Sequence, residues 1–288
     1  MTPSPADAAT QVFLEHRELL FSMVYSMLGG VADTEDVLQE TWLAWAHRGG
    51  DAIESPRAYL VRIAVNKALA RRSAIARRRE SYIGPWLPEP LVDAPEPSDD
   101  SVSVALLVVL ETLTPLERAV FLLHEVFGYA HTEIAAMLDR TPAAVRQVAH
   151  RAREHVHARR PRYPADRRLQ QEATERFTAA VTGGDLNGLL ELLAPDVTLW
   201  ADGGGKAPAA GPRPVHGRDA VAALLVGGIN RAPRQLDVRY RPVNGGPSAL
   251  LFAGDSPYAV LTLDLDPDNG RVSGIYFVTN PDKLSHIS

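Results

Sequence analysis

Residues 131–153, HTEIAAMLDRTPAAVRQVAHRAR, decide how the middle of this 288-residue chain folds. Apolar side chains recur at three- and four-residue spacing on both sides of a short break, which predicts two amphipathic helices. The inward-facing positions are Ile134, Leu138, Val145 and Val148. After the break, Thr141 followed by proline is a typical helix start, because the hydroxyl caps free backbone N–H groups and proline fits the first helical position. The stretch therefore predicts a helix-turn-helix.

The second of these helices carries an outward face rich in hydrogen-bond donors. In a helix-turn-helix that binds DNA, this helix lies in the major groove, where its side chains contact base edges and phosphates. The candidate DNA-binding residues are Arg146, Gln147, His150, Arg151 and Arg153. The motif alone leaves a second interpretation open, because short helix pairs without a nucleic-acid function are common in helical proteins.

The net charge of −5 conceals a strong segregation of charge along the chain. Residues 55–84 hold eight Lys or Arg and one acid, and residues 140–168 hold nine Arg and two acids. Between them, residues 85–105 hold five acids and no base. Two basic segments in an acidic chain indicate two contacts with a polyanion, although each alone is also compatible with a solvated helix face.

Composition excludes several classes of protein. The hydrophobic fraction of 45% and the charged fraction of 23% are those of a globular protein. The absence of cysteine excludes a disulfide scaffold, a thiolate zinc site and cysteine catalysis. No apolar run is long enough to cross a bilayer, and the first residues lack the basic-then-apolar pattern of a secretory signal. We therefore expect a cytoplasmic protein.

Periodicity and proline content divide the chain into four parts. Residues 1–84 predict helices, and residues 85–104 form a proline-rich acidic linker in which helix and central strand are both implausible. Residues 105–163 predict a second helical domain that contains the helix-turn-helix. Residues 166–288 predict helices followed by strands with period-two alternation. The expected fold is multidomain, with two all-α domains followed by an α+β domain.

Two further segments lie in the first helical domain. DTEDVLQETWL at 33–43 opens with Asp33, which we expect to cap a helix, and PRAYLVRIAVN at 56–66 opens a third helix whose arginines we expect to face outward. With residues 113–153, these segments resemble bacterial sigma factors of the extracytoplasmic-function (ECF) group. In that family the three segments bind core RNA polymerase, the promoter −10 element and the −35 element, respectively.

Three shorter motifs resemble the signature of one subgroup of this family. They are WLPEP at 86–90, DGGGK at 202–206 and NPDKL at 280–284. In this subgroup the carboxy-terminal domain is SnoaL-like, with the curved sheet of the NTF2-like fold. DGGGK is not a phosphate loop, because the lysine is followed by Ala-Pro and not by Ser or Thr and a helix. The glycine run instead indicates close backbone approach to another surface.

The resemblance implies a partner for each polar surface of the first domain. The clamp helices of the largest polymerase subunit would be bound by Asp36, Gln39 and Glu40, which share one helix face. Promoter DNA at −10 would be bound by the loop at 48–55, by the arginines at 77–79, and by Arg57, Arg62, Asn66, Lys67 and Arg71. An acidic face that is merely solvated remains an alternative for the first set.

We expect the carboxy-terminal domain to control the sigma domains through an intramolecular contact, because Trp86 and Leu87 cannot be buried by their own short segment and need a docking surface. An alternative is that these segments only stabilise their own domain. The expected regulatory residues are Trp86, Leu87, Glu89, Asp202, Lys206, Asn280, Asp282 and Lys283. We expect Lys206 to be the partner of Glu89. We also expect NPDKL, which is polar and follows the last strand, to be an exposed docking segment.

No catalytic residue, cofactor or metal set can be identified, so we expect a protein that is not an enzyme. An alternative of another class is an NTF2-like ligand-sensing or enzymatic protein with an accessory DNA-binding region. The polymerase-binding segment at 33–43 favours the sigma factor, because a sensor or repressor has no need of it. A structural RNA-binding protein is disfavoured because no aromatic RNA-binding motif is present. A small ligand of the carboxy-terminal domain stays open, with its identity unspecified.

Overall fold

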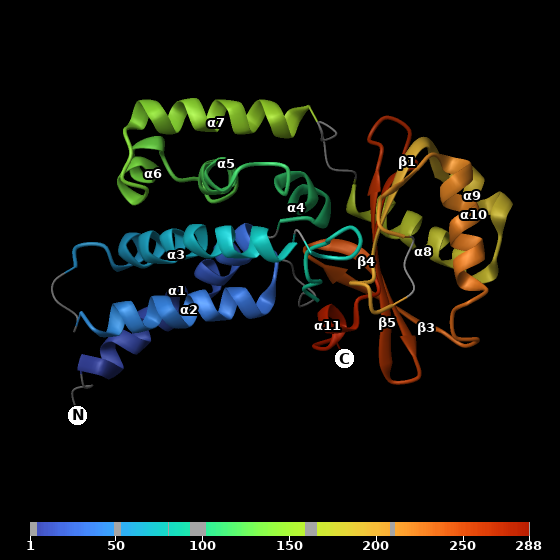
Figure 1. The fold of residues 1–288 in the computed structure, drawn as a ribbon, viewed down its shortest axis with the longest axis horizontal. Helices are drawn as coiled ribbons and strands as arrows, with labels where there is room; N and C mark the ends of the chain where they lie inside the picture. Colours follow the sequence, from blue (N-terminus) through green and yellow to red (C-terminus); the bar gives the residue numbers. More distant parts are fainter. Residues whose placement is uncertain are drawn as a thin grey trace. The chain divides into compact units, whose positions relative to one another are not determined.

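The computed structural model describes residues 5–48, 53–79, 81–92, 102–158, 166–207 and 211–287 (Figure 1). The chain divides into two compact units. The helical unit takes in Met1–Glu80 and Val109–Arg159, and the sheet unit takes in Ser81–Val108 and Arg160–Ser288. The described part of the linker therefore packs with the sheet unit.

Three long helices open the helical unit: α1 (Pro5–Leu28), α2 (Val31–Ala46) and α3 (Pro56–Arg79). α1 ends where Gly29 takes a left-handed φ of 76°, a usual helix terminator. The N-cap of α2 is Gly30, so the prediction that Asp33 caps this helix is wrong. Asp33 lies in the first turn, where the helix dipole still favours an acid, and its carboxylate binds Arg71 at 2.9 Å.

Shorter helices complete the helical unit: α4 (Val104–Leu110, which begins in the sheet unit), α5 (Pro115–Phe121), the π-helix η1 (Leu122–Val126), α6 (His131–Met137) and α7 (Pro142–His157). α6 and α7 form the predicted helix-turn-helix. The hydroxyl of Thr141 accepts a hydrogen bond from the Ala144 N–H at 3.2 Å, as its capping role predicts. Asp139 in the turn has a φ of 53°, a left-handed conformation that Asp tolerates better than most residues.

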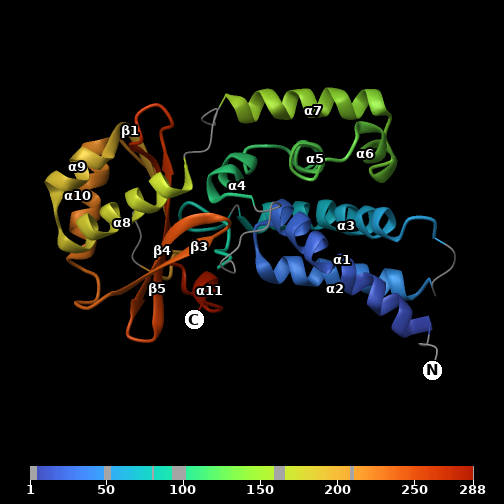
Figure 2. The same cartoon turned by 180° about the vertical axis from the view of Figure 1, so that it is seen from behind.

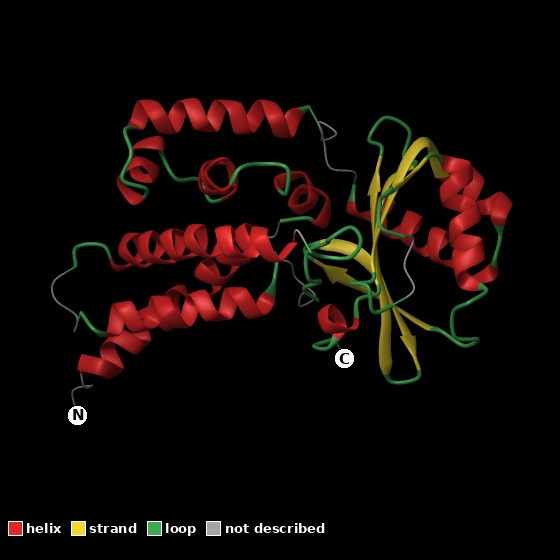
Figure 3. Ribbon diagram, in the orientation of Figure 1, coloured by secondary structure: helices red, strands yellow, loops and turns green. Residues whose placement is uncertain are grey.

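The sheet unit contains one six-stranded sheet (Figure 3). Its order is β2 (Val215–His216), β1 (Leu193–Asp202), β6 (Val272–Val278), β5 (Ser256–Leu265), β4 (Gly246–Ala253) and β3 (Asp237–Val243). β1 and β6 run parallel, and the other neighbours run antiparallel. Period-two alternation at residues 197–200, 259–265 and 272–279 predicted β1, β5 and β6. It did not indicate β3 and β4, and the latter is buried along most of both faces.

Among the described residues, the helices α8 (Arg167–Gly183), α9 (Leu186–Leu192), α10 (Arg218–Ile229) and α11 (Pro281–Leu284) pack on this sheet, and the first turn of α4 adds Val104 to its core. Two opposite views place α8, α9 and α10 on one face and α11 on the other (Figures 1 and 2). Alternate strand residues therefore build two cores. Leu251 and Leu261 belong to the core under α8 and α10, whereas Leu250 and Val260 pack with Leu87 of the linker.

Candidate functional site

Asp202 ends β1, and its side chain is fully buried. One carboxylate oxygen accepts hydrogen bonds from the Tyr82 hydroxyl at 2.5 Å and from the Gly204 N–H at 3.1 Å. The other accepts from the Leu87 N–H at 2.8 Å and from the Lys283 ammonium at 2.7 Å. A buried carboxylate needs such partners to offset its desolvation. Asp202 therefore connects the linker, the glycine run and α11, which are far apart in sequence.

Lys283 on α11 supplies the positive charge of this cluster. Its side chain is 11% exposed, and its ammonium also donates to the Leu87 carbonyl oxygen. The ammonium lies 4.2 Å from the ring centre of Trp86 and 5.2 Å from that of Tyr82, within cation–π range. Two motifs that lie about 190 residues apart in the chain, WLPEP at 86–90 and NPDKL at 280–284, thus meet at one buried ion pair.

Tyr82 belongs to this cluster although the sequence did not indicate it. Its hydroxyl donates to Asp202 and accepts from the Asn280 side-chain amide at 2.9 Å. Burial, with the hydrogen bond to the Asp202 carboxylate, raises the pKa of Tyr82 well above its usual range. Tyr82 lies four residues before WLPEP, outside the motifs shared with the family. A large aromatic beside a linker poor in apolar residues was the only available signal.

The glycine run brings backbone against α11 and the linker. Gly204 and Gly205 have left-handed φ values of 60° and 71°. A Cβ at Gly204 would lie 2.4 Å from Asn280 Nδ2, and a Cβ at Gly205 would lie 2.9 Å from Ile83 Cδ1. Neither position tolerates a side chain without displacement of its neighbour. This agrees with the interpretation that the glycines permit close approach.

The rest of the described linker is also held on the sheet unit. Leu87 is completely buried in the core beneath α11. Leu91 and Asn244 exchange two hydrogen bonds, from the Leu91 N–H to the Asn244 side chain at 3.2 Å and from the Asn244 N–H to the Leu91 carbonyl at 2.8 Å. A His286 ring nitrogen lies 2.8 Å from the Pro90 carbonyl oxygen. The linker between 82 and 92 is therefore anchored at several points.

The expected pair of Lys206 and Glu89 is wrong. The Lys206 ammonium binds Asp282 at 2.5 Å, while the Glu89 carboxylate lies 3.3 Å from His286 Nδ1. The reason is the turn after Gly203, whose carbonyl accepts from the Lys206 N–H at 3.0 Å and which directs the lysine toward the first turn of α11.

The expectation that NPDKL is an exposed docking segment is also wrong. The motif forms α11, and Asn280 caps it by accepting a hydrogen bond from the Asp282 N–H at 3.1 Å. Asn280 is 4% exposed and Leu284 is 1% exposed. The physical reason is the burial of apolar side chains, because Leu284 and Ile287 complete the core that also buries Leu87. Asp282 remains exposed.

The expected polymerase-binding residues Asp36, Gln39 and Glu40 are exposed on α2. Glu40 binds Lys67 at 3.0 Å, and Asp36 binds Arg71. Both cations belong to the expected DNA-binding face of α3, so the structure brings members of two candidate sites together. Exposed ion pairs contribute about 0–1 kcal/mol, which a binding partner can readily replace.

Two other residues of the expected −10 surface contact the second helical domain within the helical unit. The Asn66 side chain donates to the Met137 carbonyl oxygen of α6 at 2.9 Å, and the Arg57 guanidinium lies 5.8 Å from the Tyr129 ring centre. Arg62 is exposed. Part of the loop at 48–55 and the side chains at 77–79 lie outside the described residues.

The expected −35 residues lie on one face of α7. Arg146, Gln147, His150 and Arg151 are exposed, while the opposite face is buried through Val145, Val148 and Ala149. Arg153 is partly buried and binds Glu125 at 3.0 Å. The first four side chains are therefore accessible to a DNA groove, and Arg153 is committed to a protein contact.

A buried network joins the helices of the helical unit. Arg118 is 1% exposed, and its guanidinium donates to the Ser26 carbonyl oxygen at 2.9 and 2.7 Å. Arg118 also binds Glu111, which accepts from Arg72 of α3 at 2.8 Å. Arg72 is 7% exposed, so the expectation that the arginines of α3 face outward is wrong at this position. Its partner lies 39 residues away, where local periodicity carries no information.

Two absences apply to the described part of the chain. Among these residues, no group of three or more His, Asp or Glu side chains is arranged to hold a metal ion. Within the same ranges, no helix combines the length and the apolarity that crossing a membrane requires.

Family models match three parts of the chain. The model of Sigma-70 region 2 matches residues 12–79, and that of Sigma-70, region 4, matches residues 103–156. The model of a SnoaL-like domain matches residues 174–274. The first match covers the acidic stripe of α2 and the basic face of α3, and the second covers the helix-turn-helix.

Relatives extend the similarity over nearly the whole chain. The ECF RNA polymerase sigma factor SigJ of Mycobacterium tuberculosis is 35% identical over 93% of this chain and 91% of its own length. The probable ECF RNA polymerase sigma factor SigI of the same species is 29% identical over 98% and 96%. A crystal structure of SigJ superposes with a TM-score of 0.73 at 33% identity, covering 96% of this chain and 98% of that one. By these similarities the chain belongs to the ECF RNA polymerase sigma factors, in the group that carries a SnoaL-like domain after sigma region 4.

Proposed function

We propose that this sigma factor directs core RNA polymerase to its promoters, and that its SnoaL-like domain sets its activity by holding the linker between sigma regions 2 and 4. The observation that carries the proposal is the Asp202 cluster, in which one buried carboxylate binds Tyr82, Leu87 and Lys283. The chain acts in the cytoplasm, where the polymerase is, and catalyses no reaction by itself.

The linker is the element through which this control operates. Fully extended, residues 81–102 would span roughly 75 Å. Residues 82–91 of this segment are held at Asp202, Asn244 and His286, so they do not contribute to that reach. Promoter elements at −35 and −10 require regions 4 and 2 to bind DNA at separate places. Release of the linker from the sheet unit would therefore permit regions 2 and 4 to separate.

The surfaces of the helical unit take the roles that the family implies. Asp36, Gln39 and Glu40 bind the clamp helices of the largest polymerase subunit. Region 2 binds the −10 element through Arg57, Arg62, Asn66, Lys67 and Arg71. Region 4 reads the −35 element through the exposed side chains of α7, with Arg146 and Gln147 at its amino-terminal end. Four of these groups, Lys67, Arg71, Arg57 and Asn66, hold protein contacts that must be exchanged for DNA contacts.

Run-off transcription with core polymerase and a cognate promoter tests the control by the SnoaL-like domain. We expect Asp202→Ala, Lys283→Ala and removal of residues 280–288 to shift transcription in the same direction, because each releases the linker. Asp282→Ala is the matched control, because it removes only the exposed pair with Lys206. Equal transcription by all variants at equal protein level would mean that the domain does not regulate.

A pull-down with core polymerase tests the polymerase contact separately. Asp36→Arg combined with Glu40→Arg should abolish association, because it reverses the charge of an exposed stripe without touching the core. Circular dichroism would verify that the double variant stays folded. Undiminished binding by a folded double variant would contradict the assignment of this stripe.

A further inference from the structure

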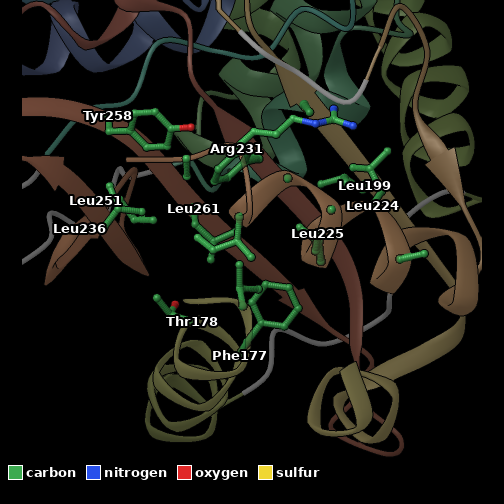
Figure 4. Close-up of a pocket in the computed structure, with 18 residues that line it drawn as sticks. Phe177, Thr178, Leu199, Leu224, Leu225, Arg231, Leu236, Leu251, Tyr258 and Leu261 are labelled. Atoms are coloured by element: carbon green, nitrogen blue, oxygen red, sulfur yellow. The ribbon is translucent and has the colours of Figure 1, made fainter. Parts of the chain in front are cut away.

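The sheet face under α8 and α10 encloses a cavity of about 280 Å³ (Figure 4). Its described lining is apolar apart from Thr178, Arg231 and Tyr258, and it contains no carboxylate, imidazole or lysine. Protein interiors are close-packed, and voids larger than a water molecule are few. A cavity of this size with an apolar lining is therefore a candidate binding site.

The volume sets the size of the occupant. An apolar cavity of about 150 Å³ holds a benzene molecule. By proportion, this cavity holds roughly ten to twelve non-hydrogen atoms. Phe177 and Leu261 form part of the apolar wall, so the body of the occupant must be apolar as well.

One positive charge lies at the cavity. Figure 4 shows Arg231 and Tyr258 at one end and Phe177 and Thr178 at the other. Arg231 follows α10, is exposed, and has no ion-pair partner among the residues that the structure describes. A guanidinium at the edge of an apolar cavity suits a carboxylate, which it can bind through two hydrogen bonds. We propose that this cavity binds a small apolar carboxylate, an aromatic or medium-chain acid whose anionic end meets Arg231.

The cavity and the Asp202 cluster lie on opposite faces of the same strands. Ala201 lines the cavity, and the next residue is Asp202. Phe277 also lines the cavity, while its neighbours Tyr276 and Val278 pack in the core that buries Leu87. Ala201 is paired with Phe277 and Asp202 with Val278 across β1 and β6. An occupant therefore contacts the strand ends that hold the linker. This coupling rests on the proposed function, whereas the binding does not.

Calorimetric titration of the full chain tests the binding without polymerase or promoter. The probes are trans-cinnamate and its neutral counterpart cinnamyl alcohol. We expect saturable binding of cinnamate, at least about tenfold tighter than that of the alcohol. Arg231→Gln should remove this preference, and Arg234→Gln, an exposed arginine on the same loop that does not line the cavity, should keep it. Leu225→Trp, at a buried position of α10 that lines the cavity, reduces the space for a ligand and should weaken binding of both probes.

If neither cinnamate nor cinnamyl alcohol binds, the proposal that this cavity is a ligand site is wrong. If both probes bind with equal affinity, or if the preference for cinnamate persists in Arg231→Gln, the proposal that Arg231 selects a carboxylate is wrong. Hydrogen exchange at the Leu87 amide, with and without saturating cinnamate, tests the coupling, and we expect its protection to change. Unchanged protection with cinnamate bound would overturn the coupling alone. Because Asp202→Ala tests the linker in transcription, failure of the ligand proposal and failure of the proposed function give different results.

Discussion

Each unit of this protein contains an ion pair between a lysine ammonium and a carboxylate, one of them buried and the other exposed. Lys283 binds Asp202 at 2.7 Å, with side chains that are 11% and 0% exposed. Lys67 binds Glu40 at 3.0 Å, with side chains that are 31% and 48% exposed. The distances are similar, so the difference between the pairs lies in their access to water.

This difference decides what each pair can do. A buried charge left without its partner costs several kcal/mol, so the Asp202 cluster must stay together or come apart as a whole. Water and salt compensate an exposed charge, so the Glu40 pair can be exchanged for a polymerase or DNA contact at little cost. The buried pair of Lys283 and Asp202 suits a two-state restraint on the linker, and the exposed pair of Lys67 and Glu40 suits a binding surface.

The largest expected effect is that of Asp202→Ala. Removal of the carboxylate leaves the Lys283 ammonium buried and the Tyr82 and Leu87 donors unsatisfied, so we expect the sheet unit to lose about 3–5 kcal/mol of unfolding free energy. Urea unfolding followed by circular dichroism measures this loss. In Asp282→Ala, which breaks an exposed pair, the loss should stay below about 1 kcal/mol. Similar losses in both variants would mean that burial does not distinguish the two carboxylates.

Arg118→Ala tests a buried network in the helical unit. The substitution removes charged hydrogen bonds to the Ser26 carbonyl and to Glu111, but Arg72 still compensates Glu111. We therefore expect a smaller loss, about 1.5–3 kcal/mol, in the urea unfolding of the helical unit. Arg62→Ala removes an exposed arginine of α3 and should change stability by less than about 0.5 kcal/mol. A loss for Arg62→Ala as large as that for Arg118→Ala would contradict the role of the network.

The helices, the helix-turn-helix and the hairpin of β5 and β6 could be predicted from the sequence, because they depend on local spacing and turn chemistry. Thr141, Pro56 and Gly29 start or end a helix within a few residues of their own position, so these roles can be predicted from the local sequence. The Asp202 cluster joins residues 82, 87, 202 and 283, whose proximity depends on tertiary packing. The motifs indicated most of its members, but they did not indicate Tyr82 or the true partner of Lys206. The prediction that Arg72 faces outward was wrong for the same reason, because its burial depends on a partner that is distant in sequence.

Tyr82→Phe should have a moderate effect with a characteristic pH dependence. Loss of the hydroxyl removes one donor to Asp202, and we expect a loss of about 1–2 kcal/mol at neutral pH. Burial and the hydrogen bond to Asp202 hold the pKa of Tyr82 above its usual range, so the folded state keeps a proton that the unfolded state releases above about pH 10. The stability of the natural protein therefore falls as the pH rises past this value, and its advantage over Tyr82→Phe shrinks.

Urea unfolding at about pH 8 and about pH 10.5 measures that advantage for Tyr82→Phe. The difference in unfolding free energy between the natural protein and the variant removes the contributions of the titrating groups that both proteins share. An advantage that is equal at the two pH values would show that Tyr82 does not titrate with a raised pKa.

The smallest expected effect is the coupling between Lys67 and Glu40. A double-mutant cycle with Lys67→Ala and Glu40→Ala should give about 0.2–1 kcal/mol in urea unfolding, and 1 M salt should reduce it because the pair is exposed. Under the proposed function, the same Glu40→Ala variant should still weaken association with core polymerase, because Glu40 is one of the residues proposed to bind the clamp helices. Under the proposed function, Glu40→Ala therefore weakens polymerase binding with little loss of stability, whereas Asp202→Ala both lowers stability and shifts transcription. A coupling above about 2 kcal/mol would place this pair in the same class as Lys283 and Asp202, and the contrast between an exchangeable and a persistent ion pair would be lost.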